Sequence, residues 1–338
     1  MDMARLTPFL ILMLLWAGCQ SDSSTSGPPP SHAAATTKAP PAPAFSASEA
    51  YLLLDTFLQA GPRVPGTTAH QQALAFIENH LRPFASTLTI QKGTARRFDG
   101  RPLPVHNVIA EFKGKSPRAL LLMAHWDSRF VADQDSTDRN KPILGADDGG
   151  SGPAVLLALA RILHQHTPPI TIRMIFFDTE DQGAPAWMTN PPPHSYCLGS
   201  QLWAKSHRPD QYFADYGILL DMVGGRQAHF LKEKWSEKFT PTQVSQIWAL
   251  AQSMGYSPPF IPIATDPVMD DHYYVATIAG IPSLDIINYD HRRQPHPFPW
   301  YWHTHHDRID IIDTATLDAV GELLTTLIYT HSGFLAVP

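Results

Sequence analysis

The sequence predicts an α/β fold: a single globular domain with a central, mostly parallel, twisted sheet and helices on both of its faces. Two patterns indicate this class. Short apolar runs alternate along the chain with stretches of helical spacing, as in parallel sheets that are covered on both sides. Several of these runs also end in carboxylates or imidazoles, and open α/β sheets bind ligands at the carboxyl ends of their strands. The 338 residues, 43% of them hydrophobic, can bury a large core.

Residues 1–19 are typical of a secretory signal. Arg5 precedes an apolar run over residues 9–16, and two small residues come directly before Cys19. The run is too short to span a bilayer permanently. A small pair followed by cysteine resembles a bacterial lipoprotein box, in which Cys19 would carry lipid. The alternative is an ordinary signal peptide with an incidental cysteine.

Residues 20–44 consist almost wholly of Ser, Thr, Ala, Pro and Gly, so they lack the apolar area that would offset the entropy of ordering. We expect a disordered tether that holds a catalytic domain, residues 45–338, away from a membrane. The lipid would be the only membrane contact of an exported, periplasm-facing monomer. Gln20 rather than Asp follows Cys19, which favours the outer membrane. If Cys19 carries lipid, Cys197 has no intramolecular partner.

The domain is expected to begin with two amphipathic helices and to continue as alternating strands and helices. The first two helices cover residues 46–58 and 68–81, on either side of a shaped loop at residues 61–66. Later helices are expected at 153–164, 198–205, 243–254 and 315–335. Strands are expected at 107–112, 119–124, 170–178, 217–223 and 283–287.

The composition of the chain argues against some classes of function and favours others. A net charge of −6 without a basic stripe argues against nucleic acid as a partner. Seventeen histidines against two cysteines indicate a catalytic rather than a structural metal site. No Gly-x-Ser-x-Gly segment is present in the sequence, which disfavours a serine hydrolase.

Polar residues follow three of the expected strands, at His125, Asp178 and Asp221, and would converge at one sheet edge. Between the first two, the glycine-rich turn over residues 145–152 carries two aspartates and no lysine, which suits a cation rather than a phosphate. After the second strand, Glu180 and Asp181 are adjacent, so they point to opposite sides of an extended backbone. One of this pair should bind metal and the other should be free to act as a general base.

Six motifs occur in this order along the chain: His125-x-Asp127, Gly145-x-x-Asp148-x-x-Ser151-Gly152, Asp178-x-Glu180-Asp181-x-Gly183, Leu220-Asp221-Met222-Val223-Gly224, Asp270-Asp271-His272 and Trp302-His303-Thr304. Together they resemble the zinc-dependent aminopeptidase superfamily. Within it they are most similar to the glutaminyl-peptide cyclotransferases of animals and their bacterial relatives. The resemblance extends from about Gly61 to the C-terminus, which is nearly the whole expected domain.

By motif position, the resemblance implies one zinc ion on Asp148, Asp181 and His303. Asp181 stands where the animal enzymes have Glu. The resemblance also implies that Glu180 is the general acid/base, with Asp221 and Asp270 in a hydrogen-bond network with it. It implies a substrate pocket formed by Val268, Met269, Phe298, Trp302 and, within a proline-rich insert over residues 183–194, Trp187.

The implied reaction cyclises the N-terminal glutamine of a peptide or protein to pyroglutamate and releases ammonia. The main alternative is a two-zinc aminopeptidase, in which His125 and Asp221 hold a second metal bridged by Asp148. Trp302 directly before the ligand and the doubled Asp270-Asp271 favour the cyclase. A binding lipoprotein without catalysis would lack the acid/base or a ligand, and both are present.

Overall fold

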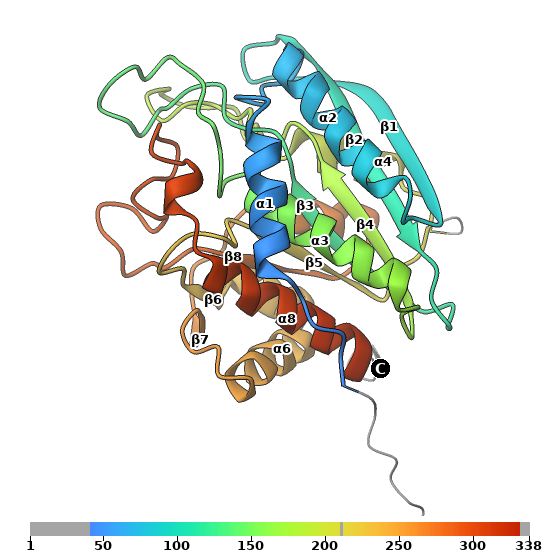
Figure 1. The fold of residues 1–338 in the computed structure, drawn as a ribbon. Coiled ribbons are helices and arrows are strands. Elements are labelled where there is room, and N and C mark those ends of the chain that lie inside the picture. The colour runs from blue at the N-terminus through green and yellow to red at the C-terminus, as the bar shows by residue number, and fades with distance from the viewer. Residues whose placement is uncertain (1–40, 210–211, 332–338) are drawn as a thin grey trace, which may run out of the picture. The chain divides into compact units, whose positions relative to one another are not determined.

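A twisted six-stranded sheet lies between two layers of helices in the computed structural model, which describes residues 41–209 and 212–331 (Figure 1). The predicted signal peptide, Cys19 and nearly all of the predicted tether lie outside the described residues. The strands are, in chain order, β1 (Thr87–Arg96), β2 (Pro102–Phe112), β3 (Ala119–His125), β4 (Thr171–Phe177), β5 (Tyr216–Asp221) and β8 (Ser283–Ile287).

Across the sheet the strand order is β1-β2-β4-β3-β5-β8. The pairs β3–β4, β3–β5 and β5–β8 are parallel, whereas β1–β2 and β2–β4 are antiparallel. The prediction of a mostly parallel sheet is therefore confirmed. The antiparallel edge strand β1 was not predicted, because its partly exposed residues show no long apolar run.

Helices cover both faces, as predicted. One face carries α1 (Ala47–Leu58), α2 (Thr68–Leu81), α3 (Ser151–Gln165) and α8 (Thr314–Thr330), with α6 (Pro241–Ser253) packed against α8. The other face carries α4 (Leu198–Ser206), α5 (Lys234–Phe239) and α7 (Asp271–Tyr274), which continues as a π-helical turn over Val275–Ala279. A separate two-stranded parallel sheet pairs β6 (Phe230–Lys232) with β7 (Phe260–Ala264).

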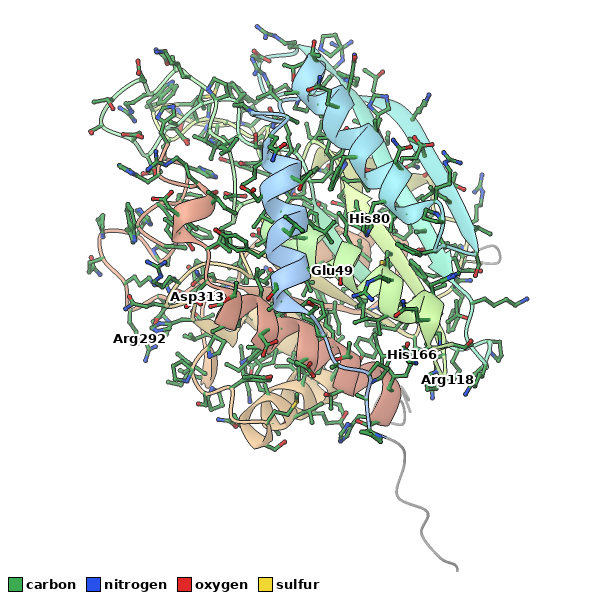
Figure 2. All side chains as sticks on the ribbon, viewed as in Figure 1. Glu49, His80, Arg118, His166, Arg292 and Asp313 are labelled. Carbon is green, nitrogen blue, oxygen red and sulfur yellow. The ribbon has the colours of Figure 1, made fainter. Side chains whose placement is uncertain are left out.

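Side-chain caps define several helix starts. Ser46 accepts a hydrogen bond from the Glu49 backbone N–H at α1, as its position before the apolar pattern suggests. Asp313, labelled in Figure 2, accepts from the Ala315 N–H at 2.9 Å at the start of α8. No helix among the described residues is long and apolar enough to cross a membrane.

Alternation along β3 builds both halves of the core. Leu120, Leu122 and Ala124 pack into the cluster beneath α1, α3 and α8, whereas Leu121 and Met123 pack into the cluster beneath α4. All five side chains are fully buried. A strand that is apolar on both faces is what a sheet covered on both sides requires.

We expect Leu122→Ala to lower the free energy of unfolding by about 2–5 kcal/mol, because the truncated side chain leaves a cavity in this core. Leu52→Ala is the matched control, since Leu52 is 64% exposed on α1 and surface changes usually stay within about 0.5 kcal/mol. Urea denaturation of both variants measures the difference. Equal losses would contradict the placement of β3 at the centre of the core.

Candidate active site

A cavity of about 360 Å³ opens at the carboxyl ends of β4 and β5. The predicted metal ligands and catalytic acids all border it: Asp148, Glu180, Asp181, Asp221, Asp270 and His303. Four of the five predicted substrate-binding residues also line it: Val268, Met269, Phe298 and Trp302. The sequence motifs, spread over more than 150 residues, therefore meet in one place.

Asp148, Asp181 and His303 form a compact donor group. The Nε2 atom of His303 lies 3.2 Å from Asp181 Oδ1 and 3.6 Å from Asp148 Oδ2. All three side chains are buried, and Asp181 Oδ2 has no hydrogen-bond partner within the described residues. Two carboxylate oxygens and one imidazole nitrogen suit zinc, and a buried carboxylate oxygen without a donor is expected where a cation binds. The residues present therefore fit this metal.

Electrostatics also favour a cation here. Burial, reinforced by the neighbouring Asp148, raises the pKa of Asp181. For His303, burial and Arg129 act to lower the pKa, but Asp181 and Asp133 outweigh them and raise it. Several carboxylates thus share a volume with little counter-charge, an arrangement that a divalent cation stabilises.

A carboxylate behind the donor group orients the imidazole. Asp133 Oδ1 lies 3.1 Å from Nδ1 of His303, on the ring edge opposite the other two donors. Arg129 in turn donates two hydrogen bonds of 2.7 Å to Asp133 and one of 3.1 Å to Asp181 Oδ1. Carboxylates in this position fix the tautomer of a metal-binding histidine. Neither Asp133 nor Arg129 was found from the sequence, because both lie in a loop without a motif.

We expect Asp133→Ala to weaken zinc binding about 10- to 100-fold, since His303 loses the partner that orients it. Asp135→Ala is the control in the same loop: Asp135 contacts His305 and none of the three donors. Competition with a chromogenic chelator measures both affinities. Equal affinities for the two variants would argue against a role of Asp133 at the metal.

Glu180 faces the cavity beside the donor group. Its Oε1 accepts a hydrogen bond from the Cys197 thiol at 3.2 Å, and its Oε2 lies 3.9 Å from His125 Nδ1. Burial, opposed by His125 and reinforced by Asp270, raises the pKa of Glu180 well above its usual range. The two adjacent acids thus have different neighbours, with Asp181 beside His303 and Glu180 beside Cys197 and His125. They lie in a bend after β4, not on the extended backbone that the prediction assumed.

Asp221 and Asp270 are each linked to Glu180 through one residue that lies between them. Asp221 Oδ1 lies 3.3 Å from His125 Nε2, and Asp270 Oδ1 lies 3.9 Å from the Cys197 sulfur. Each acid therefore shares a neighbour with Glu180. Burial is the largest cause of the raised pKa of Asp221 and of Asp270.

A second donor group adjoins the first. His125 Nε2 lies 3.1 Å from Asp148 Oδ1, on the side of Asp148 away from His303, as well as near Asp221. Asp148 is thus shared by the two groups. The geometry of the described residues accommodates the ligand set of the two-zinc alternative as well as that of the one-zinc prediction.

Aromatic side chains wall the cavity. The rings of Phe298 and Trp302 stack with centroids 4.2 Å apart, and Trp302 also stacks on His303 at 3.7 Å. Trp187 is not brought to the cavity. Its side chain is 45% exposed, with the Arg139 guanidinium 5.0 Å above the ring. Tyr196, just after the insert, lines the cavity, and no sequence motif pointed to it.

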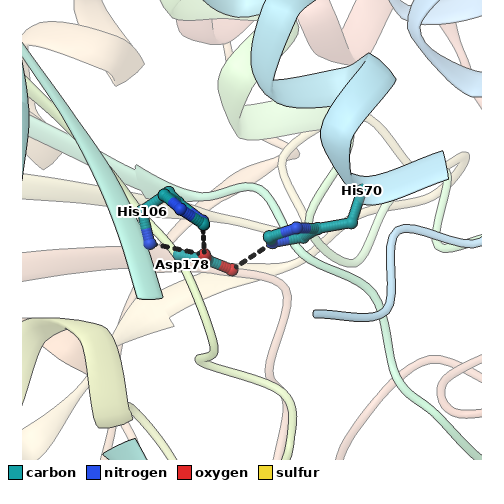
Figure 3. Close-up of side chains that lie close together, drawn as sticks. All are labelled: His70, His106 and Asp178. Carbon is teal, nitrogen blue, oxygen red and sulfur yellow. Dashed lines mark hydrogen bonds and ion pairs between the residues drawn. The ribbon is translucent and has the colours of Figure 1, made fainter. Parts of the chain in front are cut away.

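Asp178 ends its strand as predicted but does not line the cavity. Figure 3 shows it between two histidines: Nε2 of His70 lies 2.9 Å from Oδ1, and the His106 backbone N–H donates to Oδ2 at 2.7 Å. The Thr179 N–H also donates to Oδ1. Asp178 therefore ties α2 and β2 to the turn that carries Glu180, which gives it a supporting position.

Comparison with known proteins agrees with this fold, which is that of zinc-dependent exopeptidase-like proteins. The chain belongs to Peptidase family M28, whose model matches residues 107–328. Among solved structures it is similar to the glutaminyl cyclase of Tannerella forsythia, with 41% identity, a TM-score of 0.82, and coverage of 85% of this chain and 99% of the other.

Two further relatives extend this similarity. A Zn-dependent exopeptidase from Parabacteroides distasonis is 41% identical, with a TM-score of 0.82, over 86% of this chain and 99% of that chain. The glutaminyl-peptide cyclotransferase of Drosophila melanogaster is 26% identical over 78% of this chain and 75% of its own length. The resemblance drawn from the six motifs is confirmed.

Proposed function

We propose that this protein is a zinc-dependent glutaminyl-peptide cyclotransferase, which converts the N-terminal glutamine of peptides and proteins to pyroglutamate and releases ammonia. One observation carries the proposal: Glu180 lies beside a buried Asp-Asp-His donor group, at a cavity walled by stacked aromatic rings. The similarity to bacterial glutaminyl cyclases over most of the chain supports it.

The donor group and the acid have separate roles. Asp148, Asp181 and His303 would hold one zinc ion, which would supply a Lewis acid for the oxygen of the substrate's γ-carboxamide. Glu180 takes a proton from the α-amine as that nitrogen forms a bond to the δ-carbon. Glu180 then gives the proton to the amide nitrogen, which leaves as ammonia when the bond between the δ-carbon and nitrogen breaks.

The surroundings of Glu180 serve this proton transfer. The Cys197 thiol holds Oε1, so Oε2 is the oxygen that is free to exchange a proton. Asp221 contacts His125 and Asp270 contacts Cys197, and through these two neighbours the aspartates hold the Glu180 side chain in place. Phe298 and Trp302 exclude water, which is not a reactant in this cyclisation.

A two-zinc aminopeptidase is the second candidate, because the group of His125, Asp148 and Asp221 adjoins the first. The deciding experiment offers the purified protein a Gln-initiated peptide and an aminopeptidase substrate, and follows ammonia and free amino acids alongside a zinc count. We expect ammonia release with one zinc per chain. Release of amino acids with two zinc ions per chain would establish the aminopeptidase instead.

Location and assembly are proposals from the sequence. Residues 1–44 suit an exported, periplasm-facing lipoprotein, with the outer membrane as the favoured site and lipid on Cys19 as the only anchor. The domain would act as a monomer on peptide substrates. Metabolic labelling with a radioactive fatty acid, compared between the native chain and Cys19→Ser, tests the anchor.

A further inference from the structure

A second cavity lies directly beside the catalytic one. It has a volume of about 260 Å³ and is bordered by the insert over residues 183–194 and by Tyr274 of α7. Tyr196 and Met269 line both cavities, so the two share a wall. Met269 is 46% exposed, which places this wall at the surface rather than in the core.

The walls of the second cavity suit an apolar side chain. Pro191, Pro192 and the Tyr274 ring contribute carbon surface. The Tyr274 hydroxyl lies 2.9 Å from Nδ1 of His194, and the Tyr196 hydroxyl donates to the Ala184 carbonyl at 3.1 Å, so both hydroxyls already have partners. Among the described residues that line this cavity, none is Asp, Glu, Lys or Arg. A charged group would find no counter-ion there.

The insert is held in place before any ligand arrives. The Ala186 N–H donates to Asp133 Oδ2 at 2.7 Å, and the Gln201 side chain donates to the His194 carbonyl at 3.0 Å. Prolines fix the backbone φ between these two anchors. A preformed wall costs little conformational entropy on binding.

We propose that this cavity binds the side chain of the residue that follows the N-terminal glutamine and selects peptides with a large apolar or aromatic residue there. The proposal rests on the proposed function and names its substrate class. A peptide whose glutamine occupies the catalytic cavity must extend out of it, and the second cavity adjoins the first across Tyr196 and the partly exposed Met269. A cavity of about 150 Å³ is enough for a benzene ring, so 260 Å³ holds a phenylalanine or leucine side chain.

The test compares kcat/KM for ammonia release from Gln-Xaa-Ala amides in which Xaa is Gly, Leu, Phe, Asp or Lys. Partial burial of one apolar side chain is worth about 1.4 kcal/mol, so Phe and Leu should exceed Gly about tenfold. Asp and Lys should not exceed Gly. The Gly peptide reports catalysis alone, because it has no side chain to bind.

Pro192→Asp tests the position of the subsite. It should abolish the preference for Phe and favour Lys, while leaving the rate with the Gly peptide unchanged. Pro193→Asp is the matched control, since Pro193 is also exposed but does not line the cavity. It should keep the native preference for Phe.

The outcomes separate the two proposals. Equal kcat/KM for Gly, Leu, Phe and Lys would overturn the subsite and leave the cyclase function intact. The same change of preference in Pro192→Asp and Pro193→Asp would also overturn it, because a general surface charge would then be the cause. If no peptide releases ammonia, the proposed function fails and the subsite proposal fails with it.

Discussion

Replacing Glu180 by Gln should lower kcat for ammonia release about 10²- to 10⁴-fold, the usual contribution of a positioned general acid/base. Gln keeps the shape of the side chain and can still accept a hydrogen bond from the Cys197 thiol, which lies 3.2 Å from Oε1 in the native chain. It cannot take a proton from the α-amine. Loss of activity would therefore reflect lost proton transfer rather than a rearranged site.

The zinc content and the KM of this variant make the result decisive. The zinc content of Glu180→Gln should equal that of the native protein, because Glu180 lies outside the group of Asp148, Asp181 and His303. KM for a Gln-initiated peptide should change far less than kcat, since the aromatic walls are untouched. Near-native activity with a normal zinc content would refute the role of Glu180 as general acid/base. Loss of zinc would show instead that Glu180 is a metal ligand.

Cys197→Ser is a useful companion to this variant. Serine keeps an O–H donor toward Glu180, so most of the activity for ammonia release should survive. Cys197 is fully buried at the start of α4, with a φ of 58°. The thiol identified from the sequence as unpaired thus acquires a contact that the spacing of the motifs could not show.

Strand geometry accounts for part of the predicted site, whereas Asp148, Asp270 and His303 lie outside strands and were assigned by the resemblance to the cyclotransferases. Strands β3 and β5 end at His125 and Asp221, and parallel strands bring such ends to one edge. Periodicity is a property of the local chain, and these positions follow from it.

The positions of side chains in loops could not be predicted from the periodicity of the sequence. The resemblance placed Trp187 in the pocket, but the insert turns its indole toward Arg139 and solvent. Asp133 and Tyr196 reach the site only because long loops fold back over the sheet, and no spacing rule predicts where such loops pass. Asp178 is the opposite case: its position at the end of a strand was predicted, but its carboxylate contacts His70 rather than the cavity.

Loop positions matter here because they complete the metal site. The Arg129 guanidinium donates to both Asp133 and Asp181. Arg129 therefore orients the carboxylate behind His303 as well as one carboxylate of the donor group. Burial of this cluster would be costly without compensating charge. A divalent metal ion at the donor group would supply further positive charge to this cluster.

His303→Ala should remove zinc from the protein and abolish ammonia release, with a loss of at least about 10³-fold, larger than that for one oxyanion donor. The imidazole is the single nitrogen donor of the group, and Asp148 and Asp181 would be left as two buried carboxylates near each other. Metal analysis after gel filtration measures the zinc, and thermal unfolding checks that the variant is folded.

His125→Ala is the matched comparison, because it removes the other imidazole that contacts Asp148. With one zinc per chain, His125→Ala keeps the full zinc content, and its activity falls only through the weaker support of Glu180, whose Oε2 lies 3.9 Å from His125. With two zinc ions, native protein would hold two and His125→Ala would lose one. The pair of variants thus separates the cyclase ligand set from the aminopeptidase ligand set, which replacement of the shared Asp148 could not do.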